Sequence, residues 1–346
     1  MRVLILHDEV RAAARPDELD TLVQVDAVAA ALAAAGMDVA RLAFGADLAA
    51  LAEGVRAAAP DVVFNLVESV LGEGRLIHLA PSLLEALAVP FTGAGSAAML
   101  LSSGKLLAKR VLAAHGLPTP AWHTPGELRA GADLGARRRW LAKSVWEHGS
   151  LGLEADSVLA PASAEELADE VERRIAELGG EAFAEEYVHG REFNAALLAG
   201  PDGPECLPIP EIRFPGLAPD DPRVVGYRAK WAPDSREWDA TPRSFARDAR
   251  DERLHARLRE LALAAWDAFD LEGAARVDFR VGEDGEPQVI DVNANPCLSP
   301  DAGFAATLER AGIRYADALA RILEAGLARH ARTRRALDVP HPADLR

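Results

Sequence analysis

The sequence predicts an α/β protein, α+β overall, and three observations indicate it. Short apolar runs alternate with helical patterns in the first third, the alternation restarts after residue 98 around a glycine-containing loop, and the last third holds two strands joined by a tight turn. A length of 346 residues allows two or three domains. We predict a parallel-sheet domain (1–98), a small central unit (99–190), a mixed-sheet unit (191–330) and a mobile tail (331–346).

The first third favours a parallel sheet covered by helices. The apolar runs predict strands at 3–6, 61–67 and 89–92, and helical spacing predicts helices at 21–35 and 81–88. Strands separated by helices are typical of parallel sheets with both faces covered.

The middle third predicts a helix at 100–114, strands at 140–145, 157–159 and 182–188, and a glycine loop at 147–152. Ser163 and Glu166 form the pattern of a capping box, which predicts a helix beginning there.

In the last third, strands are expected at 193–198, 207–213, 276–281 and 288–292, a helix at 251–269, and a loop at 215–242. Glu283, Asp284 and Gly285 form a hairpin turn between the last two strands, and further helices end near residue 328.

Composition excludes several classes of partner. The 54 acidic and 38 basic residues leave a net charge of −16, which repels nucleic acids and anionic membranes. Two cysteines are too few for a disulfide framework, and no apolar run is long enough to span a membrane. We therefore expect a cytoplasmic protein whose partners are small molecules.

The strongest chemical signal lies in the predicted hairpin. Period-two alternation puts Arg276 and Asp278 on one face of the first strand, and Asp291 and Asn293 on one face of the second. Two carboxylates and an amide oxygen suit Mg²⁺ held together with substrate phosphates. The alternative is an exposed hairpin that carries ordinary surface acids.

A magnesium site of this kind requires donors for the phosphates. Met99 and Leu106 occupy the Gly and Ser/Thr positions of a Walker loop. The Gly93–Ala98 segment fits the loose dinucleotide pattern, but no acidic residue ends a second strand about 20 residues further on, as that fold needs. What remains is the glycine loop, with Lys105 and Lys143 as point charges. The loop residues expected at the phosphates are His148, Gly149, Ser150 and Gly152. The alternatives are a plain turn with solvated lysines and, for His148, an exposed position.

An ordered series of motifs then resembles the ATP-grasp superfamily, and within it the D-alanine–D-alanine ligases, from Met1 to about residue 328. The motifs are Val63-Phe64-Asn65-Leu66-Val67-Glu68, Val89-Pro90-Phe91-Thr92-Gly93-Ala94-Gly95, Glu185-Glu186-Tyr187-Val188 with Glu192, Tyr227-Arg228-Ala229-Lys230, and the hairpin of Arg276, Asp278, Asp291 and Asn293.

The resemblance implies an ATP-grasp fold that uses ATP with Mg²⁺ or Mn²⁺. The segment from Glu185 through Tyr187 would clamp the adenosine, with the backbone of Glu186 and Val188 facing adenine and Glu192 holding the ribose hydroxyls. Lys230 would lie on the mobile loop that closes the site. Family members are typically homodimers formed through their N-terminal domains, so we expect a homodimer.

The chemistry expected is the phosphorylation of a carboxylate followed by attack of an amine. Asp278, Asp291 and Asn293 would hold the metal at the β- and γ-phosphates. Arg276 and the backbone N–H near Cys297 would stabilise the oxyanion of the tetrahedral intermediate, and Lys230 and Ser150 complete the expected catalytic set.

Departures from the family pattern concentrate in the amino-acid half of the site. Asp291 stands for the usual Glu, Cys297 for Gly, Gly149 for the first loop serine, and Trp231 for the tyrosine after Lys230. The serine that meets the second substrate has no clear match, and Ser299 or Asp301 are its candidates. Three alternatives therefore stay open: D-Ala–D-Ala synthesis, ligation of another amino acid or specialised metabolite, and non-catalytic nucleotide binding.

Overall fold

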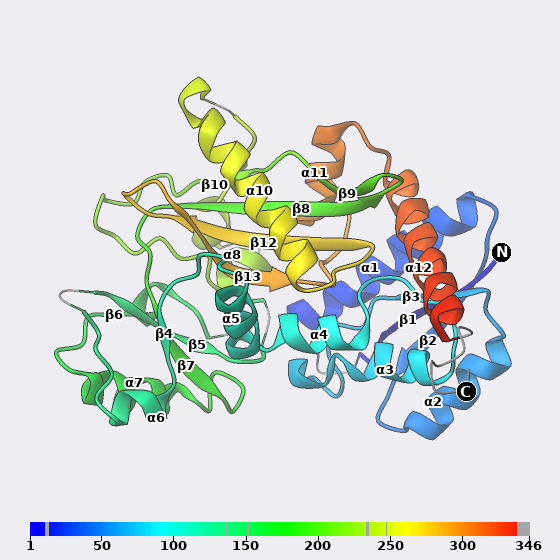
Figure 1. The fold of residues 1–346 in the computed structure, drawn as a ribbon, viewed down its shortest axis with the longest axis horizontal. Helices are drawn as coiled ribbons and strands as arrows, with labels where there is room; N and C mark the ends of the chain where they lie inside the picture. Colours follow the sequence, from blue (N-terminus) through cyan, green and yellow to red (C-terminus); the bar gives the residue numbers. More distant parts are fainter. Residues whose placement is uncertain are drawn as a thin grey trace, which may run out of the picture.

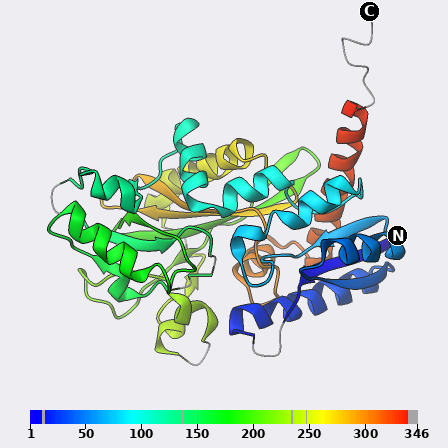
Figure 2. The same ribbon diagram turned by 90° about the horizontal axis from the view of Figure 1, so that it is seen from below.

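The computed structural model describes residues 1–10, 14–135, 138–147, 149–150, 152–232, 235–246 and 248–337. It contains three sheets, and Figure 1 shows the N-terminal sheet and the small central sheet at opposite ends of the molecule, with the largest sheet between them. Figure 2 gives the same arrangement at right angles. The α/β class expected from the sequence is confirmed.

The N-terminal sheet is parallel, with the strand order β2 (Asp38–Phe44), β1 (Arg2–Asp8), β3 (Val62–Asn65). Helices α1 (Pro16–Ala34), α2 (Leu48–Ala58) and α3 (Leu79–Ala86) surround it, with the 3₁₀ turn η1 (Gly74–Leu76) before α3. The sequence prediction missed β2 and α2, because β2 is a largely exposed edge strand without a buried apolar run. The strand expected at 89–92 is only a single bridge between Val63 and Phe91.

Two helices replace the single one expected at 100–114: α4 (Ser96–Ser103) and α5 (Lys105–Ala114). They meet at Gly104, where a β-carbon would lie 2.7 Å from Cζ3 of Trp146, so no larger residue fits there. The Lys105 N–H donates to Val145 O (2.9 Å) instead of continuing the helix. The break therefore depends on a contact that is distant in the sequence.

The central sheet is antiparallel, in the order β4 (Trp122–His123), β7 (Ala182–Glu186), β5 (Trp140–Ser144), β6 (Val158–Leu159). It is joined by α6 (Pro125–Arg129), α7 (Ala164–Arg174) and the 3₁₀ turn η2 (Ala155–Ser157). Ser163 caps α7 as expected, by accepting from the Glu166 N–H, but the Glu166 carboxylate accepts from Ala162 rather than from Ser163.

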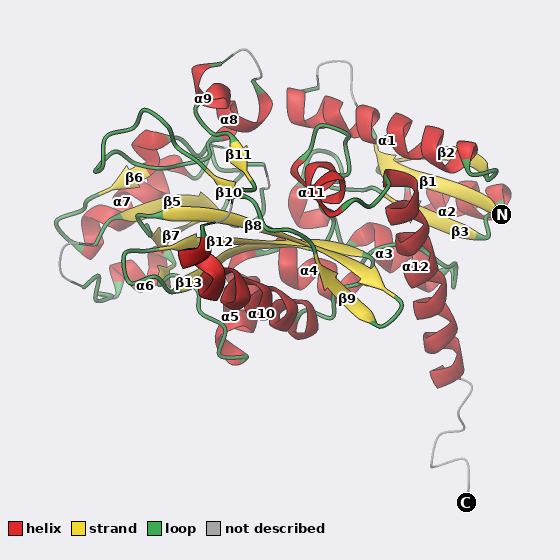
Figure 3. Ribbon diagram, turned by 90° about the horizontal axis from the view of Figure 1, so that it is seen from above, coloured by secondary structure: helices red, strands yellow, loops and turns green. Residues whose placement is uncertain are grey.

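The largest sheet runs β11 (Arg243–Ser244), β10 (Glu211–Ile212), β8 (Arg191–Gly200), β12 (Ala274–Val281), β13 (Pro287–Asn293), with β9 (Gly203–Cys206) also paired to β8. Its described pairings are antiparallel throughout, so the mixed sheet expected here is wrong in that detail. Figure 3 shows α5 and α10 (Glu252–Ala268) on one side of this sheet, where they share its apolar core.

The loop expected at 215–242 contains two short helices, α8 (Tyr227–Trp231) and α9 (Arg236–Asp239), and the 3₁₀ turn η3 (Ala249–Asp251) precedes α10. Figure 3 places α8 and α9 on the opposite side of the large sheet from α10. The segment that carries Lys230 is therefore a helical turn above the sheet rather than an irregular loop.

The chain continues through α11 (Gly303–Ala311) and α12 (Tyr315–Leu337). Residues of α12 share one apolar core with α1, β1 and β3, so the C-terminal helix packs against the N-terminal domain. The tail expected from residue 331 is wrong in its first part, because α12 continues to Leu337; residues 338–346 lie outside the described residues. None of the helices that the structure describes is long and apolar enough to cross a membrane.

Candidate functional site

A pocket of about 980 Å³, counted with its part open to solvent, lies between the central sheet, the large sheet and the segment before α8. Its lining includes nearly every residue that the sequence singled out: Lys105, Lys143, Gly149, Ser150, Glu185, Glu186, Tyr187, Val188, Glu192, Lys230, Arg276, Asp278, Asp291 and Asn293. Gly152 does not line it, and His148 lies outside the described residues.

The β12–β13 hairpin supplies the floor of the pocket. Asp278 lies opposite Asp291, and Arg276 lies opposite Asn293, so the two same-face pairs that alternation predicted meet across the hairpin. Asp278 is 7% exposed, so an exposed hairpin with ordinary surface acids is excluded. Arg276 Nε and Nη2 donate to the two oxygens of Asp278 (both 2.8 Å), and Asn194 Nδ2 donates to Oδ1 (2.9 Å).

Charge on this floor is balanced locally. Burial alone would lower the pKa of Arg276, but the Asp278 carboxylate outweighs it and raises that pKa. Within the described residues, no group of three or more His, Cys, Asp and Glu side chains is arranged to hold a metal. The two carboxylates and the Asn293 amide are hard oxygen donors that fit Mg²⁺ only if a ligand such as phosphate supplies further oxygens.

The opposite wall carries a buried ion triad. Glu185, 2% exposed, accepts a hydrogen bond from Lys143 Nζ at Oε2 (2.9 Å), and its Oε1 forms an ion pair with Lys109 Nζ (2.7 Å). Burial would raise the pKa of Glu185, but the two ammonium groups outweigh burial and lower it. For Lys143, burial lowers the pKa, while Glu185 and Asp291 raise it to a net value above normal. The Glu185 carboxylate therefore holds the Lys143 ammonium in place at the pocket.

Lys109 anchors this triad from α5. It is 3% exposed, and its Nζ also donates to Thr119 Oγ1 (2.8 Å) and Pro120 O (3.2 Å). Thr119 Oγ1 donates in turn to Val289 O of β13 (2.7 Å). The lysine thus links the central sheet to the hairpin floor.

Lys105 enters the pocket from the first turn of α5. Its Nζ donates to the backbone oxygen of Glu147 (2.7 Å), and burial lowers its pKa although Asp291 opposes that shift. The side chain is 8% exposed, so neither this lysine nor Lys143 is the solvated surface residue that was the alternative.

Hydrogen bonds join the glycine loop to α8 and to the segment before it. Ser150 adopts a left-handed backbone (φ 65°), as Gly149 does (φ 70°), a conformation that costs free energy for a serine. Ser150 Oγ donates to Val225 O (2.8 Å), and Trp231 Nε1 donates to Gly149 O (3.1 Å). Trp231, a departure from the family pattern, therefore fastens α8 to the loop.

Lys230 faces the hairpin floor from α8. Burial and the neighbouring Arg276 lower its pKa, against the carboxylates of Asp278 and Glu192. Together with Lys105 and Lys143 it places three ammonium groups around one pocket.

The remaining wall of the pocket is formed by the end of β7 and the start of β8. Glu192 lies at the start of β8, and burial raises the pKa of its carboxyl, partly opposed by Arg280. Arg280 contacts Glu192 and the Val188 carbonyl. Glu186 pairs with Arg138 (3.0 Å) at the pocket rim.

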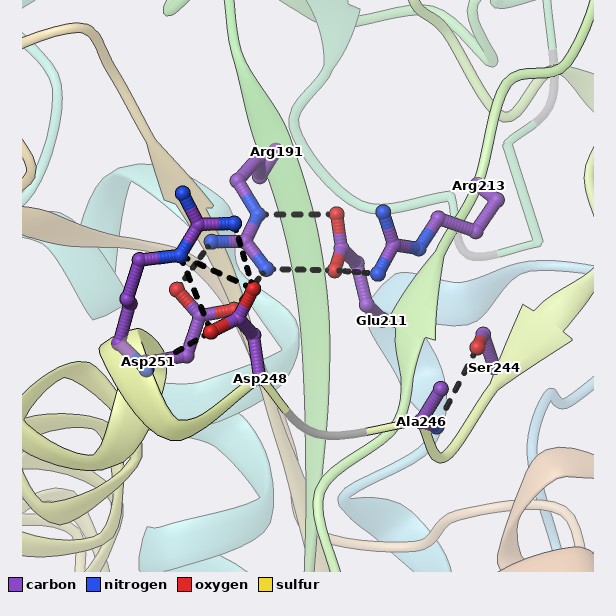
Figure 4. A network of polar contacts seen from close by, with 8 residues as sticks. Arg191, Glu211, Arg213, Ser244, Ala246, Asp248 and Asp251 are labelled. Carbon is purple, nitrogen blue, oxygen red and sulfur yellow. Dashed lines mark hydrogen bonds and ion pairs between the residues drawn. The ribbon is translucent and has the colours of Figure 1, made fainter.

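Behind this wall, Arg191 fixes the start of β8 from the other face of the sheet. Its guanidinium bridges Glu211 (2.9 and 2.6 Å) and Asp251 (2.9 and 2.7 Å), as Figure 4 shows. Arg213 also pairs with Glu211 (2.8 Å). Because successive residues of a strand point to opposite faces, this network immobilises the backbone that carries Glu192 without entering the pocket.

The two candidates for the second-substrate serine do not line the pocket. Ser299, fully buried, donates to both oxygens of Asp20 (3.0 Å each), and the Asp301 backbone oxygen accepts from Arg243 (3.0 Å). Cys297 Sγ also lies 3.0 Å from Asp20, and burial raises its pKa, so the thiol is a packing group rather than a nucleophile. The Leu298 N–H, one of those near Cys297, donates to Gln24 (2.6 Å) and so points away from a substrate.

A cluster of Asp8, Asp20, Gln24 and Glu68 lies close to Arg276 of the floor. Burial and the nearby Asp8 raise the pKa of Glu68 to about 8, although Gln24 donates to it and Arg276 stabilises its charge. Burial also raises the pKa of Asp8 to about 6. Neither residue's environment was predicted from the sequence, because the cluster brings together side chains from β1, from α1 and from the segment after β3.

This raised pKa predicts how stability depends on pH. Folded Glu68 keeps a proton that the unfolded chain releases near its ordinary pKa of 4.5. Its stabilising contribution is therefore complete below about pH 4.5 and is lost as the pH rises to about 8, by up to about 1.4 kcal/mol per pH unit. Glu68→Gln removes this loss of stability with rising pH. When urea unfolding is measured at about pH 5 and about pH 8.5, the free energy of unfolding of the variant relative to the wild type should be higher at about pH 8.5. Parallel stability curves for the two proteins would contradict the prediction.

Sequence reasoning missed three residues that organise the pocket, although signals for them existed. Lys109 follows Lys105 by one helical turn, Arg280 continues the alternation of Arg276 and Asp278, and Asn194 stands two residues after Glu192 on one strand face. Each signal identifies a shared face but not the partner found there.

The family model and the similar sequences both point to one protein family. The model of the family described as D-ala D-ala ligase C-terminus matches residues 143–324. The chain is 30% identical over 279 residues to a D-alanine–D-alanine ligase of Mycobacterium sp. (strain KMS), covering 79% of this chain and 70% of the relative. It is 29% identical over 270 residues to the uncharacterized protein y4sG of Sinorhizobium fredii (strain NBRC 101917 / NGR234), covering 78% and 75%.

Solved structures share the fold. A D-alanine–D-alanine ligase from Bacillus anthracis complexed with ATP superposes with a TM-score of 0.69 at 21% identity, covering 96% of this chain and 99% of that one. D-alanyl-alanine synthetase A from Vibrio cholerae O1 biovar eltor str. N16961 gives 0.72 at 16% identity, covering 94% and 98%.

Proposed function

The chain belongs to the D-ala D-ala ligase C-terminus family of ATP-grasp ligases, and from this premise we propose that it is an ATP-dependent carboxylate–amine ligase that forms ADP and phosphate. The observation that carries the proposal is the convergence of Lys105, Lys143 and Lys230 on a pocket floored by carboxylates and an amide. Point charges of this kind position a triphosphate, which is most of what phosphoryl transfer requires of a protein.

The carboxylates and the amide on the floor of the pocket are also the proposed ligands of a metal ion. Asp278, Asp291 and Asn293 would hold Mg²⁺ or Mn²⁺, and the bound ion would neutralise phosphate charge during transfer. Asp291 is one methylene shorter than the family's usual glutamate, so its reach toward the ion is shorter.

The proposed reaction consists of two displacement steps. A carboxylate oxygen of the first substrate forms a bond to the γ-phosphorus and ADP leaves; the amine of the second substrate then attacks the acyl carbon, and phosphate leaves with that carboxylate oxygen. Lys105, Lys143 and the glycine-loop amides hold the triphosphate, and Lys230 faces the transferred group. The Nη1 edge of Arg276, not used in its pair with Asp278, stabilises the oxyanion of the tetrahedral intermediate, at about 3–4 kcal/mol per donor.

The substrates are proposed as amino acids or related small carboxylates and amines, not specifically D-alanine. Ser150 is bonded to Val225, Trp231 replaces the family's tyrosine, and Ser299 is bonded to Asp20. The groups that position D-alanine in the family pattern are therefore absent or differently engaged. A cytoplasmic homodimer remains part of the proposal.

A substrate panel tests the proposal. Phosphate release from ATP and Mg²⁺ is measured with D- and L-amino acids, singly and in pairs, and should rise above background only with the true pair. Tight ATP binding with no release for any pair would favour a non-catalytic nucleotide-binding protein. Absence of both ATP binding and release would contradict the proposed function altogether.

A further inference from the structure

Arg280 is a buried guanidinium in the wall of the pocket. It lies on β12, on the same face as Arg276 and Asp278, directly opposite Glu192 of β8, and is 5% exposed. A buried arginine needs its donors satisfied, so what it contacts defines what it does.

The guanidinium joins three separate segments of the wall. Its Nε and Nη2 donate to Val188 O (3.1 and 2.9 Å), and its Nη1 donates to Glu192 Oε2 and to Arg223 O (3.1 Å each). The charged plane also lies 5.7 Å from the centre of the Tyr187 ring. Only a planar fork reaches all three oxygens at once, and an ammonium would not.

We propose that Arg280 is a positioning residue that sets nucleoside recognition by orienting the Glu192 carboxylate toward a ribose and by engaging the Val188 carbonyl. This rests on the proposed function. With Oε2 engaged by Arg280, the orientation of Oε1 is fixed, so a ribose hydroxyl meets an acceptor that needs no reorganisation. Val188 can then offer a base its N–H but not its carbonyl, which favours adenine, whose N1 is an acceptor, over guanine.

The hydrogen bond from Arg280 to the Arg223 carbonyl also connects the nucleoside wall to the segment before α8. Arg223 N donates to the hydroxyl of Tyr187 (2.7 Å), and four residues further along the chain α8 begins with Tyr227. Arg280 therefore ties the nucleoside wall to the segment that carries Lys230. Loss of the guanidinium should loosen the ribose contact first, because that contact depends on one carboxylate.

Ribose discrimination is the test, because a merely structural role would weaken all nucleotides equally. Dissociation constants of ATP, 2′-deoxy-ATP and 3′-deoxy-ATP are measured by calorimetry on the full chain with Mg²⁺. The wild type should prefer ATP by about tenfold or more, as for a hydrogen bond to a charged group. In Arg280→Met, the dissociation constant of ATP should rise about tenfold, and those of the two deoxy nucleotides should change little. The ratio of the deoxy-ATP and ATP dissociation constants should therefore approach one.

Two further variants make the result interpretable. Arg280→Lys keeps the charge and should still lose most of the preference, since it cannot serve Glu192 and Val188 together. Arg139→Met removes the other guanidinium over the Tyr187 ring (4.9 Å), which contacts neither group, and should keep the wild-type preference. Thermal unfolding confirms that each variant is folded.

The outcomes separate the two claims. A wild type that binds no nucleotide overturns the proposed function and this inference with it. A wild type that binds ATP without ribose preference, or an Arg280→Met variant that keeps the preference, overturns the inference alone and leaves the ligase proposal intact.

Discussion

Replacing Asn293 by alanine is expected to lower ATP-dependent phosphate release about 10³-fold while leaving the fold intact. The amide lies on the hairpin floor opposite Arg276, and it is one of three oxygen donors proposed for the metal. Loss of one such group removes charge stabilisation that exists mainly in the transition state. Asn293 is better suited to this test than Asp278, because removing Asp278 would also leave Arg276 without its partner.

The measurement is steady-state phosphate release with the substrate pair found by the panel, across a range of Mg²⁺ concentrations. Glu286→Gln is the matched control, since this carboxyl lies exposed on the same hairpin and its loss should leave the rate unchanged. A normal rate in Asn293→Ala would rule out the proposed metal site.

The second large effect is on stability. Glu185→Gln should lower the free energy of unfolding by about 3–5 kcal/mol, because two buried ammonium groups, Lys109 and Lys143, lose their shared counter-charge. Chemical denaturation measures the change. The control is Glu172→Gln, which removes one acceptor of Arg129 at a surface pair 40% and 43% exposed and should cost less than about 1 kcal/mol. Equal losses in the two variants would show that the triad is not the source of the stability.

Patterns local in the sequence predicted the parts of the molecule that local rules control. Alternation placed Arg276, Asp278, Asp291 and Asn293 on one floor, and the structure confirms it. The same reasoning missed β2, whose side chains are mostly exposed, so that no apolar run marks it.

What the sequence did not predict depends on pairs that meet only in the folded chain. The helix break at Gly104 depends on the Trp146 ring, and the orientation of Glu185 depends on Lys109. The hydrogen bond from Ser150 to Val225 joins residues that are 75 positions apart in the sequence. In each case the residue types were visible, but the partner was not, because tertiary packing decides between several compatible neighbours.

Activation of the carboxylate as an acyl phosphate in this pocket can be tested directly by isotope transfer. The carboxylate substrate identified by the panel is labelled with ¹⁸O in both carboxyl oxygens, and the phosphate released during ligation is analysed by mass spectrometry. We expect one ¹⁸O atom in each phosphate, because the oxygen that bonds to the γ-phosphorus leaves with it. Phosphate that carries no label while amide product accumulates would rule out an acyl-phosphate intermediate.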